Sequence, residues 1–373
     1  MQKNKTKKLT RAQRRRRRKI RRVAWRSGLC VLTLIGLVLI AALSAGQAAF
    51  NGPSQTVGDL LTVSMLETSA LKFVPRIFYG KEKMAEVVAR NSVSDETDET
   101  DTSLIVVAKP TPAPDPNAEP DEPEAETTVA PTPTPAPANL ISSEDGIEIY
   151  GVKSGTYTGY MMVVLDPARV TVGTCRDKFT NERGLQLKDI AARYDALAAI
   201  NGGGFEDVGG VGNGGKPVGL VISEGNVMHT GDAGKYNITV GFNQDNIMII
   251  SKDMSKGEAE KKGIRDAITF GPALIVNGEP VSVKGASSGL NPRTAIGQRA
   301  DGAVLMLVID GRQASSLGAT YSDLISVMLE YKAINAINMD GGSSSLMYYH
   351  GDYLNSGVVL TGSRTMPTAF IVR

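Results

Sequence analysis

An amide and a carboxylate stand together at the end of an apolar segment near the C-terminus. In residues 333–345, AINAINMDGGSSS, alternate residues of an extended chain share one face, so Asn338 and Asp340 emerge on the same side. A Gly-Gly pair and three serines follow at once. A carboxylate can activate water or attack an electrophilic carbon, and the N–H groups and hydroxyls of such a turn can hold an anion. The pattern predicts a functional site.

Two other segments end in a similar way. Residues 196–204 (ALAAINGGG) and 303–312 (AVLMLVIDGR) are apolar runs that end in Asn201 or Asp310, each followed by glycine. Glycine permits positive φ and close approach of the backbone, so we expect Asn201, Asp310 and Asp340 to converge on one ligand. The alternative is that Asn-Gly and Asp-Gly pairs merely form turns.

One arginine has a rigid neighbour. In residues 291–297, NPRTAIG, Pro292 fixes φ beside Arg293, before a segment that can enter a strand. A guanidinium group held in this way suits a phosphate, which it can bind through two parallel hydrogen bonds. A structural salt bridge is the alternative interpretation.

The N-terminal part of the chain has a different composition. Residues 1–28 contain fourteen of the 41 Lys and Arg residues and no acidic residue, which leaves 27 basic against 39 acidic residues elsewhere. The basic cluster alone would suit nucleic acid. However, residues 29–50 are uncharged and mostly apolar, and their length can cross a hydrocarbon core of about 30 Å. We therefore predict a lipid bilayer as the partner and no nucleic acid.

The charge distribution also predicts a topology. Basic residues before a span retain that end in the cytoplasm, so residues 1–28 form a cytoplasmic tail, residues 29–50 a single-pass transmembrane helix, and the bulk of the chain lies outside the cell membrane. A cleaved signal peptide is the alternative. Residues 51–90 have helical periodicity interrupted at Pro75 and predict a juxtamembrane helical stalk. Residues 91–141, rich in Pro, Thr and acidic residues, predict a disordered linker.

Residues 142–373 are long enough for one substantial core, which the alternation of apolar residues predicts to be an α+β domain of mixed β-sheets packed with a few helices. A helix is expected to begin after Thr320, with Asp323 completing a capping box. The expected elements are strands at 147–152, 157–165, 170–174 and 368–372, a helix at 185–194, and hairpins at 217–228, 269–281 and 348–354.

Metal and cysteine chemistry have little support in the sequence. The two cysteines are Cys30, in the apolar span, and Cys175, so they form no disulfide framework in the domain. The two histidines, His229 and His350, do not make a zinc motif or support Ser-His-Asp catalysis. We expect no cofactor. Clustered Asp, Asn and Glu side chains are able to hold Ca²⁺, but no ligand loop of recognised spacing supports it.

Five short stretches, in this order, resemble the phosphodiester glycosidase family: AAINGGGF (198–205), GPALIVNGE (271–279), NPRTAIG (291–297), IDGR (309–312) and AINMDGGSSS (336–345). The likeness covers about residues 147–373. The family pattern has NGGFF where this chain has NGGGF, so Gly204 replaces an aromatic residue that would line the sugar site, whereas Phe205 remains.

The resemblance implies hydrolysis of the bond between a sugar anomeric carbon and a phosphodiester oxygen. Glycoside hydrolysis commonly uses two carboxylates. We predict Asp340 and Glu206 as this pair, with Asp310 as a competitor, and expect Arg293 and Arg364 to hold the phosphate. Asn201 and Asn338 would bind sugar hydroxyls or an acetamide. The predicted substrate-binding residues are Asn201, Gly202, Gly203, Arg293, Asn338, Gly341, Gly342, Ser343, Ser344 and Arg364.

An anchored extracytoplasmic enzyme suits an envelope substrate, such as a teichoic acid or another phosphate-linked glycopolymer carrying alpha-N-acetylglucosaminyl or related hexosyl units. Three alternatives stay open: a non-catalytic module that binds envelope glycans, a phosphodiesterase or phosphotransferase that breaks the P–O bond, and a purely structural envelope protein.

Overall fold

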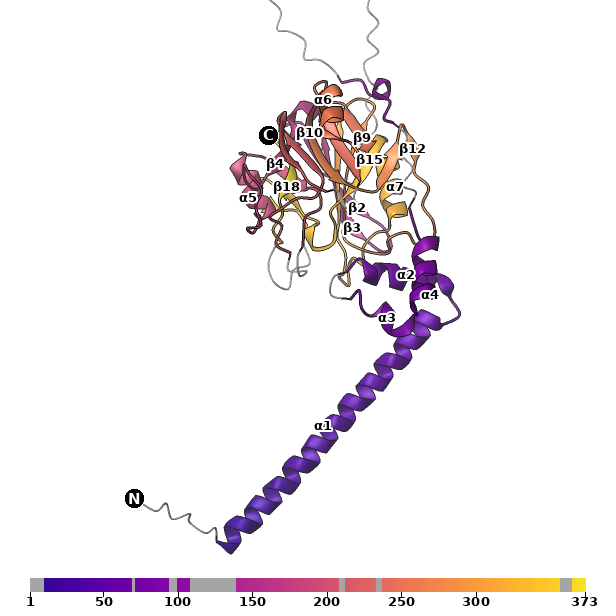
Figure 1. Cartoon of the computed structure of the whole chain (residues 1–373), viewed down its shortest axis with the longest axis vertical. Coiled ribbons are helices and arrows are strands. Elements are labelled where there is room, and N and C mark those ends of the chain that lie inside the picture. Colours follow the sequence, from indigo (N-terminus) through magenta and orange to yellow (C-terminus); the bar gives the residue numbers. More distant parts are fainter. Residues whose placement is uncertain are drawn as a thin grey trace, which may run out of the picture.

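The computed structural model describes residues 10–68, 71–93, 99–107, 139–207, 212–232, 237–355 and 364–373. Within these ranges the chain forms a long N-terminal helix, three short helices at its end, and a C-terminal domain built on three β-sheets (Figure 1). This confirms the predicted α+β class. The α-helices are α1 (Arg11–Asn51), α2 (Gln55–Leu66), α3 (Pro75–Phe78), α4 (Lys81–Arg90), α5 (Leu187–Arg193), α6 (Lys256–Lys261) and α7 (Tyr321–Glu330).

The pairings between the described strands are antiparallel. The first sheet has the order β1 (Leu140–Glu144), β2 (Ile147–Lys153), β3 (Thr158–Val164), β14 (Val304–Ile309), β13 (Arg293–Arg299), β15 (Ala333–Met339), β11 (Ala273–Val276), β12 (Glu279–Pro280). The second is β7 (Asn226–Thr230), β6 (Leu220–Ser223), β10 (Ile264–Phe270), β8 (Ile238–Asn243), β9 (Met248–Lys252). The third is β17 (Asp352–Tyr353), β16 (Met347–Tyr349), β5 (Ala198–Asn201), β18 (Thr368–Val372), β4 (Val170–Thr174).

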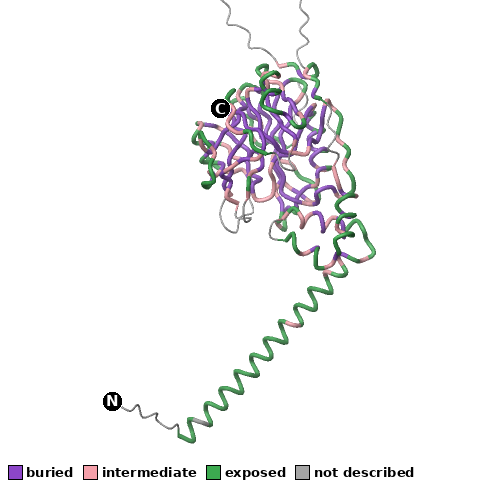
Figure 2. Tube along the Cα trace, viewed as in Figure 1, coloured by how far each residue is buried: buried purple, intermediate pink, exposed green. Residues whose placement is uncertain are grey.

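The apolar alternation explains how the three sheets share one core. In β14, Met306 and Val308 point into a cluster that also contains Phe242 of the second sheet and Phe370 of the third. The alternate residues of β14, such as Leu307, pack on the opposite face against α7. A strand covered on both faces needs an unbroken apolar run, and VLMLVI provides one. Figure 2 shows the buried residues gathered in the centre of this domain.

The helix α7 begins as predicted. The Thr320 hydroxyl accepts a hydrogen bond from the Asp323 N–H, and the Asp323 carboxylate accepts one from the Thr320 N–H at 2.8 Å, which satisfies two N–H groups that the helix leaves free. Leu324 and Met328 on its inner face are buried against the first sheet. This packing sets where the following strand, β15, enters the sheet.

The helix α1 is long and apolar enough to cross a membrane, and most of its described residues are exposed along its length (Figure 2). It begins at Arg11, so the basic residues before the apolar run are also helical. Its C-terminal end contacts α2 and α3, and Lys83 of α4 donates to the Asn51 side chain at 2.8 Å. These three short helices lie between α1 and the domain (Figure 1). Pro75 stands at the first turn of α3, where its missing N–H costs no helical hydrogen bond.

Part of the predicted disordered linker is ordered. Residues 99–107 lie on the domain, where the Thr100 hydroxyl exchanges hydrogen bonds with the Ile250 backbone at 2.9 Å and Ile105 is buried. The prediction is wrong for this piece because the acidic and Pro-rich average hides the short apolar run LIVV at 104–107. Residues 91–93 and 139–141 of the predicted linker are also described, and β1 begins at Leu140. Residues 94–98 and 108–138 lie outside the described residues.

Candidate active site

The antiparallel register brings three chain segments to one end of the first sheet. Arg293 opens β13 opposite Ile309, the last residue of β14, while Thr294 faces Met339, the last residue of β15. The residues that follow β14 and β15 therefore emerge beside Arg293. Residues separated by tens of positions in the sequence meet there because neighbouring strands run in opposite directions.

Asn201 joins the third sheet to this end of the first. Its side-chain amide donates to the Asp340 carbonyl oxygen at 2.5 Å, and its side-chain oxygen accepts from the Thr294 hydroxyl at 2.7 Å and the Leu346 N–H at 3.1 Å. The residue is buried and does not line the pocket beside Asp340. Its carboxamide is thus already engaged within the protein, and it holds the backbone of Asp340 in place.

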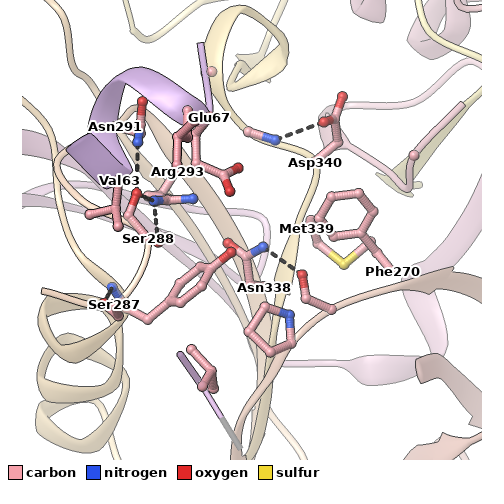
Figure 3. Close-up of a pocket in the computed structure, with 18 of the residues that line it drawn as sticks. Val63, Glu67, Phe270, Ser287, Ser288, Asn291, Arg293, Asn338, Met339 and Asp340 are labelled. Atoms are coloured by element: carbon pink, nitrogen blue, oxygen red, sulfur yellow. Dashed lines mark hydrogen bonds between the residues drawn. The ribbon is translucent and has the colours of Figure 1, made fainter. Parts of the chain in front are cut away.

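A cavity of about 660 Å³ opens at this point (Figure 3), within the roughly 300–1,000 Å³ usual for small-molecule sites. The C-terminal domain supplies most of its wall, and α2, α4 and the residues that directly follow each of these two helices supply the rest. The polar residues of the domain at the cavity are Asp207, Asn237, Ser287, Ser288, Asn291, Arg293, Arg312, Tyr321, Asn338, Asp340, Ser343 and Arg364.

Arg293 is buried and held rigidly. Its Nε donates to the Ala319 carbonyl at 3.2 Å, and its Nη2 donates to the carbonyls of Ser288 and Gly289, each at 3.1 Å. The Tyr321 ring lies 4.6 Å from the guanidinium carbon. Among the described residues no carboxylate forms a salt bridge with Arg293, so its charge is oriented by neutral groups and remains uncompensated by an ion pair.

Arg312 adds a second cation. Its Nη2 donates to the Asn291 side-chain oxygen at 2.9 Å. Burial lowers the pKa of Arg312, and the positive charges of Arg293 and Arg364 lower it further, while the carboxylate of Glu67 raises it. Three guanidinium groups that repel one another at one cavity provide a strong field for an anion.

Arg364 is the third cation and the one with a carboxylate partner. Its Nη2 forms an ion pair with Asp207 at 2.7 Å, its Nη1 lies 3.5 Å from the Ser343 hydroxyl, and its guanidinium carbon lies 4.7 Å from the centre of the Phe205 ring. Its Nε is buried without a hydrogen-bond partner among the described residues. Part of its hydrogen-bonding capacity is therefore still available.

Asp340 lies at the cavity, where Gly341 N–H donates to its carboxylate at 3.0 Å (Figure 3). Burial raises the pKa of Asp340 above its ordinary value, and the negative charge of Asp207 acts in the same direction. The Ser344 hydroxyl, the charge of Arg364 and the Gly341 N–H oppose this by favouring the ionised form. A carboxyl group in this setting is suited to proton transfer or nucleophilic attack.

The side-chain oxygen of Asn338 accepts no hydrogen bond from the described residues. Its side-chain amide donates to the Gly271 carbonyl at 2.9 Å (Figure 3), and its backbone N–H donates to Pro272 at 3.0 Å. The residue is only 2% exposed, yet its side-chain oxygen has no hydrogen-bond partner among the described residues. Leaving a buried acceptor unpaired costs about 1–3 kcal/mol, so a ligand O–H or N–H at this point would be favoured.

The structure does not bring every predicted site residue to the cavity. Glu206 is exposed and forms an ion pair with Lys216 at 2.6 Å. The Asp310 carboxylate accepts from the Asn355 amide at 3.0 Å, and burial raises its pKa. The cavity wall includes Arg293, Asn338, Asp340, Gly341, Gly342, Ser343 and Arg364 from the predicted set, but not Glu206, Asp310, Asn201, Gly202, Gly203 or Ser344.

The glycines at or near the cavity differ in what their missing side chain allows. A Cβ at Gly202 would stand 2.8 Å from the Thr368 backbone, and one at Gly203 would stand 2.7 Å from the Thr269 carbonyl, so these two permit close packing of strands behind the site. Gly342 has a φ of +65° beside the Arg312 guanidinium. Gly204 lines the cavity, and a Cβ there would stand 3.0 Å from the Phe270 ring, which occupies the space that a larger side chain would need.

Two charged residues at the cavity, Asp207 and Arg312, are not among the residues predicted from the sequence. Asp207 directly follows Glu206, and choosing between two adjacent carboxylates requires knowing which one faces inward. Arg312 lies in the IDGR stretch that carries the family resemblance, and this position is the signal that would have identified it. Neither the described residues around the cavity nor those elsewhere form a group of three or more His, Cys, Asp or Glu side chains able to hold a metal ion.

Comparison with known proteins gives a consistent assignment. The model of the phosphodiester glycosidase family matches residues 194–373. The SPbeta prophage-derived uncharacterized protein YomE of Bacillus subtilis (strain 168) is 31% identical over 200 residues, which are 52% of this chain and 29% of that protein. The chain thus spans less than a third of the length of this curated relative.

The fold also has solved counterparts. The catalytic domain of zebrafish N-acetylglucosamine-1-phosphodiester alpha-N-acetylglucosaminidase, auto-inhibited by its pro-peptide, superimposes with a TM-score of 0.50 at 21% identity, covering 63% of this chain and 86% of that one. A hypothetical protein from Synechocystis gives a TM-score of 0.47 at 16% identity, covering 63% of each chain. Residues 194–373, which contain the cavity's arginines and Asp340, match the model of the phosphodiester glycosidase family.

Proposed function

We propose that this protein is a membrane-anchored, extracytoplasmic hydrolase that cleaves the bond between the anomeric carbon of a sugar and the oxygen of a phosphodiester. The observation that carries the proposal is the convergence of three guanidinium groups, Arg293, Arg312 and Arg364, on the cavity that also holds Asp340. The family match and the apolar helix α1 support the chemistry and the anchoring respectively.

The reaction consumes one water molecule. The bond from C1 to the phosphate oxygen breaks, the water oxygen is added to C1, and the products are a free sugar and a phosphate monoester. The leaving phosphate has a second pKa near ~6, so it needs little protonation in order to depart. The three arginines would bind the phosphodiester and stabilise the charge that develops on the departing group.

The reaction also requires a group that acts at C1 of the sugar. The Asp340 carboxylate would act there, either by activating the water or by attacking C1, and Asp207 would be the second carboxylate in place of Glu206. The unpaired side-chain oxygen of Asn338 would accept a hydrogen bond from a sugar hydroxyl or an acetamide N–H. The last interaction suits an alpha-N-acetylglucosaminyl or related hexosyl unit of a cell-envelope glycopolymer.

The test uses the full-length protein in detergent with a panel of hexosyl phosphodiesters, including the alpha-N-acetylglucosaminyl compound, and follows release of free sugar. Asp340→Asn should reduce the rate roughly a hundred- to ten-thousand-fold. A carboxyl group whose pKa is raised in the folded protein destabilises the fold when it ionises at neutral pH. Asn does not ionise and avoids this cost, so the variant should unfold at the same or a higher temperature than wild type.

Three results would contradict the proposal. Hydrolysis in ¹⁸O-labelled water that places the label on phosphate would indicate P–O cleavage instead. Tight sugar-phosphate binding by the folded protein without turnover across the panel would indicate a binding module. A folded protein that neither binds nor cleaves any member of the panel, and in which Asp340→Asn changes only stability, would indicate a structural role.

A further inference from the structure

The short helices after α1 are joined firmly to its end. We define the juxtamembrane unit as the described residues 55–68 and 71–93, which include α2, α3 and α4. The Phe50 ring near the end of α1 stacks on Phe78 with centroids 4.8 Å apart, and Lys83 donates to the Asn51 side chain at 2.8 Å. The juxtamembrane unit therefore has a defined position relative to the end of the apolar helix.

The same unit is joined to the loop that orients Arg293. The Ser64 hydroxyl of α2 accepts from the Leu290 N–H at 2.9 Å, and the Asn91 side-chain oxygen accepts from the Ala286 N–H at 2.7 Å. A Cβ at Gly289 would stand 2.4 Å from the Ser64 backbone nitrogen, which shows how closely the two segments approach. Two of the three carbonyl oxygens that hold Arg293, those of Ser288 and Gly289, come from this loop.

The juxtamembrane unit also forms part of the cavity wall, and most of that part is apolar. Its four apolar contributions are Val63 and Leu66 from α2, Val88 from α4, and Val93. Its three polar contributions are Thr68, Asn91 and Glu67, the last of which lies near Arg312. Val88 is 48% exposed, although it is apolar and lines a cavity that contains three arginines. A polar anion site thus adjoins an apolar wall.

The apolar wall lies close to the proposed membrane surface. The helix α2 has 12 residues and is therefore about 18 Å long, and its C-terminal end, Leu66, is at the cavity while its N-terminal end adjoins α1. Phe73 and Ile77 of the same unit are 58% and 56% exposed, as expected for side chains that rest on a bilayer interface.

We propose that the substrate is a membrane-borne glycosyl phosphodiester, in which the phosphate carries a long hydrocarbon chain that lies along Val88 and Leu66 while the arginines bind the phosphate. The inference rests on the proposed function and narrows its substrate class. Water is added to C1 of the sugar, the C1–O bond breaks, and the lipid leaves as its phosphate monoester with the bridging oxygen.

The test compares two substrates with the same sugar and phosphate, one bearing a butyl group and one bearing a C30 or longer isoprenoid chain. Full-length protein is reconstituted in phosphatidylglycerol and phosphatidylethanolamine vesicles, and the panel of sugars is the one used for the proposed function. The long-chain substrate should have a kcat/KM at least tenfold higher than the butyl substrate.

A matched pair of variants separates a pocket effect from enrichment at the bilayer. Val88→Glu places a charge on the cavity wall, whereas Val57→Glu places it on α2 at a residue that is 47% exposed and does not line the cavity. Val88→Glu should lower the long-chain to butyl ratio at least fivefold, and Val57→Glu should leave it unchanged, because enrichment at the bilayer affects both variants equally.

The two proposals fail in different ways. Equal cleavage of both substrates by wild type, or equal ratios in the two variants, would overturn the lipid-linked substrate and leave the glycosidase intact. Folded protein that cleaves neither substrate with any sugar of the panel would overturn the proposed function itself.

Discussion

Two clusters of buried charge in this domain have opposite character. In the scaffold, Asp266 is fully buried in β10 beside Arg265, and its carboxylate also accepts from the Val172 N–H at 2.8 Å and the Glu224 N–H at 3.1 Å. Arg265 in turn donates to the Val170 carbonyl at 2.9 Å. Charge and hydrogen-bond donors are balanced within the protein, so this cluster needs no ligand.

The cavity has the reverse balance. Three arginines face it, and Arg364 is the one with a carboxylate ion pair among the described residues, while Asn338 keeps an unpaired oxygen. Keeping such groups together costs folding free energy, because like charges repel and unpaired polar atoms lose hydration. The difference teaches that unpaired buried polarity, more than burial itself, indicates where a ligand binds.

The largest expected effect comes from breaking the balanced cluster. Asp266→Ala leaves Arg265 largely buried without its carboxylate and removes the acceptor of two backbone N–H groups, so it should lower the free energy of unfolding by about 3–5 kcal/mol. Chemical denaturation measures this change. The kcat of the folded fraction should stay at the wild-type value, and selective loss of kcat with normal stability would refute the assigned scaffold role.

The next effect concerns the unbalanced cluster. Arg312→Lys keeps the charge but loses the planar fork, and we expect kcat/KM for a sugar phosphodiester to fall about ten- to a hundredfold. Steady-state kinetics measure it. The control is Arg299→Lys, since Arg299 pairs with Asp301 away from the cavity and its replacement should change kcat/KM less than twofold. Equal losses of kcat/KM in both variants would show that Arg312 does not bind the phosphate.

The pH profile sharpens the comparison further. If the Asp340 carboxylate acts at C1, kcat/KM falls as the pH drops through its pKa, which burial raises above 3.8. The charge of Arg364 favours the ionised form of Asp340. Arg364→Gln should therefore raise the pKa of Asp340 and move the fall of kcat/KM at low pH, the acid limb of the profile, to higher pH. Arg299→Gln serves as the control and should leave the limb in place. A limb that moves to lower pH in Arg364→Gln would contradict the assignment.

The smallest expected effect distinguishes two adjacent carboxylates. Glu206→Gln removes an exposed ion pair with Lys216, which contributes at most about 1 kcal/mol to stability, and should change kcat/KM less than twofold. Asp207→Asn removes the partner of Arg364 at the cavity and should reduce kcat/KM about tenfold or more. Steady-state kinetics of both variants on one substrate show which of them loses more kcat/KM. A larger loss in Glu206→Gln would indicate that Glu206, and not Asp207, is the second carboxylate.

The N-terminal helices teach a related lesson about composition. Composition and periodicity predicted a stalk at residues 51–90 and a disordered linker at residues 91–141. In the structure, α2 and α4 form part of the cavity wall, and residues 99–107 lie on the domain. Composition averages over tens of residues, whereas docking depends on a few side chains such as Ser64 and Asn91 that meet complementary groups.

Local patterns in the sequence alone determined much of this protein. The 22-residue apolar run, the capping box at Thr320, the hairpin turn at Glu224 and Gly225, and the shared face of Asn338 and Asp340 depend on neighbours within a few positions, where backbone geometry has few alternatives. The five short stretches that carry the family resemblance all lie within residues 194–373, which the family model matches, although the resemblance was expected to begin at about residue 147.

Only the tertiary structure decided which polar side chains share the cavity. The Asn201 side chain donates to the backbone carbonyl of Asp340. Asp207, rather than Glu206, forms the ion pair with Arg364. The guanidinium group of Arg312 lies close enough to Arg293 for their charges to interact. The first two choices depend on contacts between residues more than a hundred positions apart, and the third depends on the register between β13 and β14. A shift of one residue in an antiparallel pair would reverse each side chain's direction, so sequence spacing cannot specify them without the packing of all three sheets.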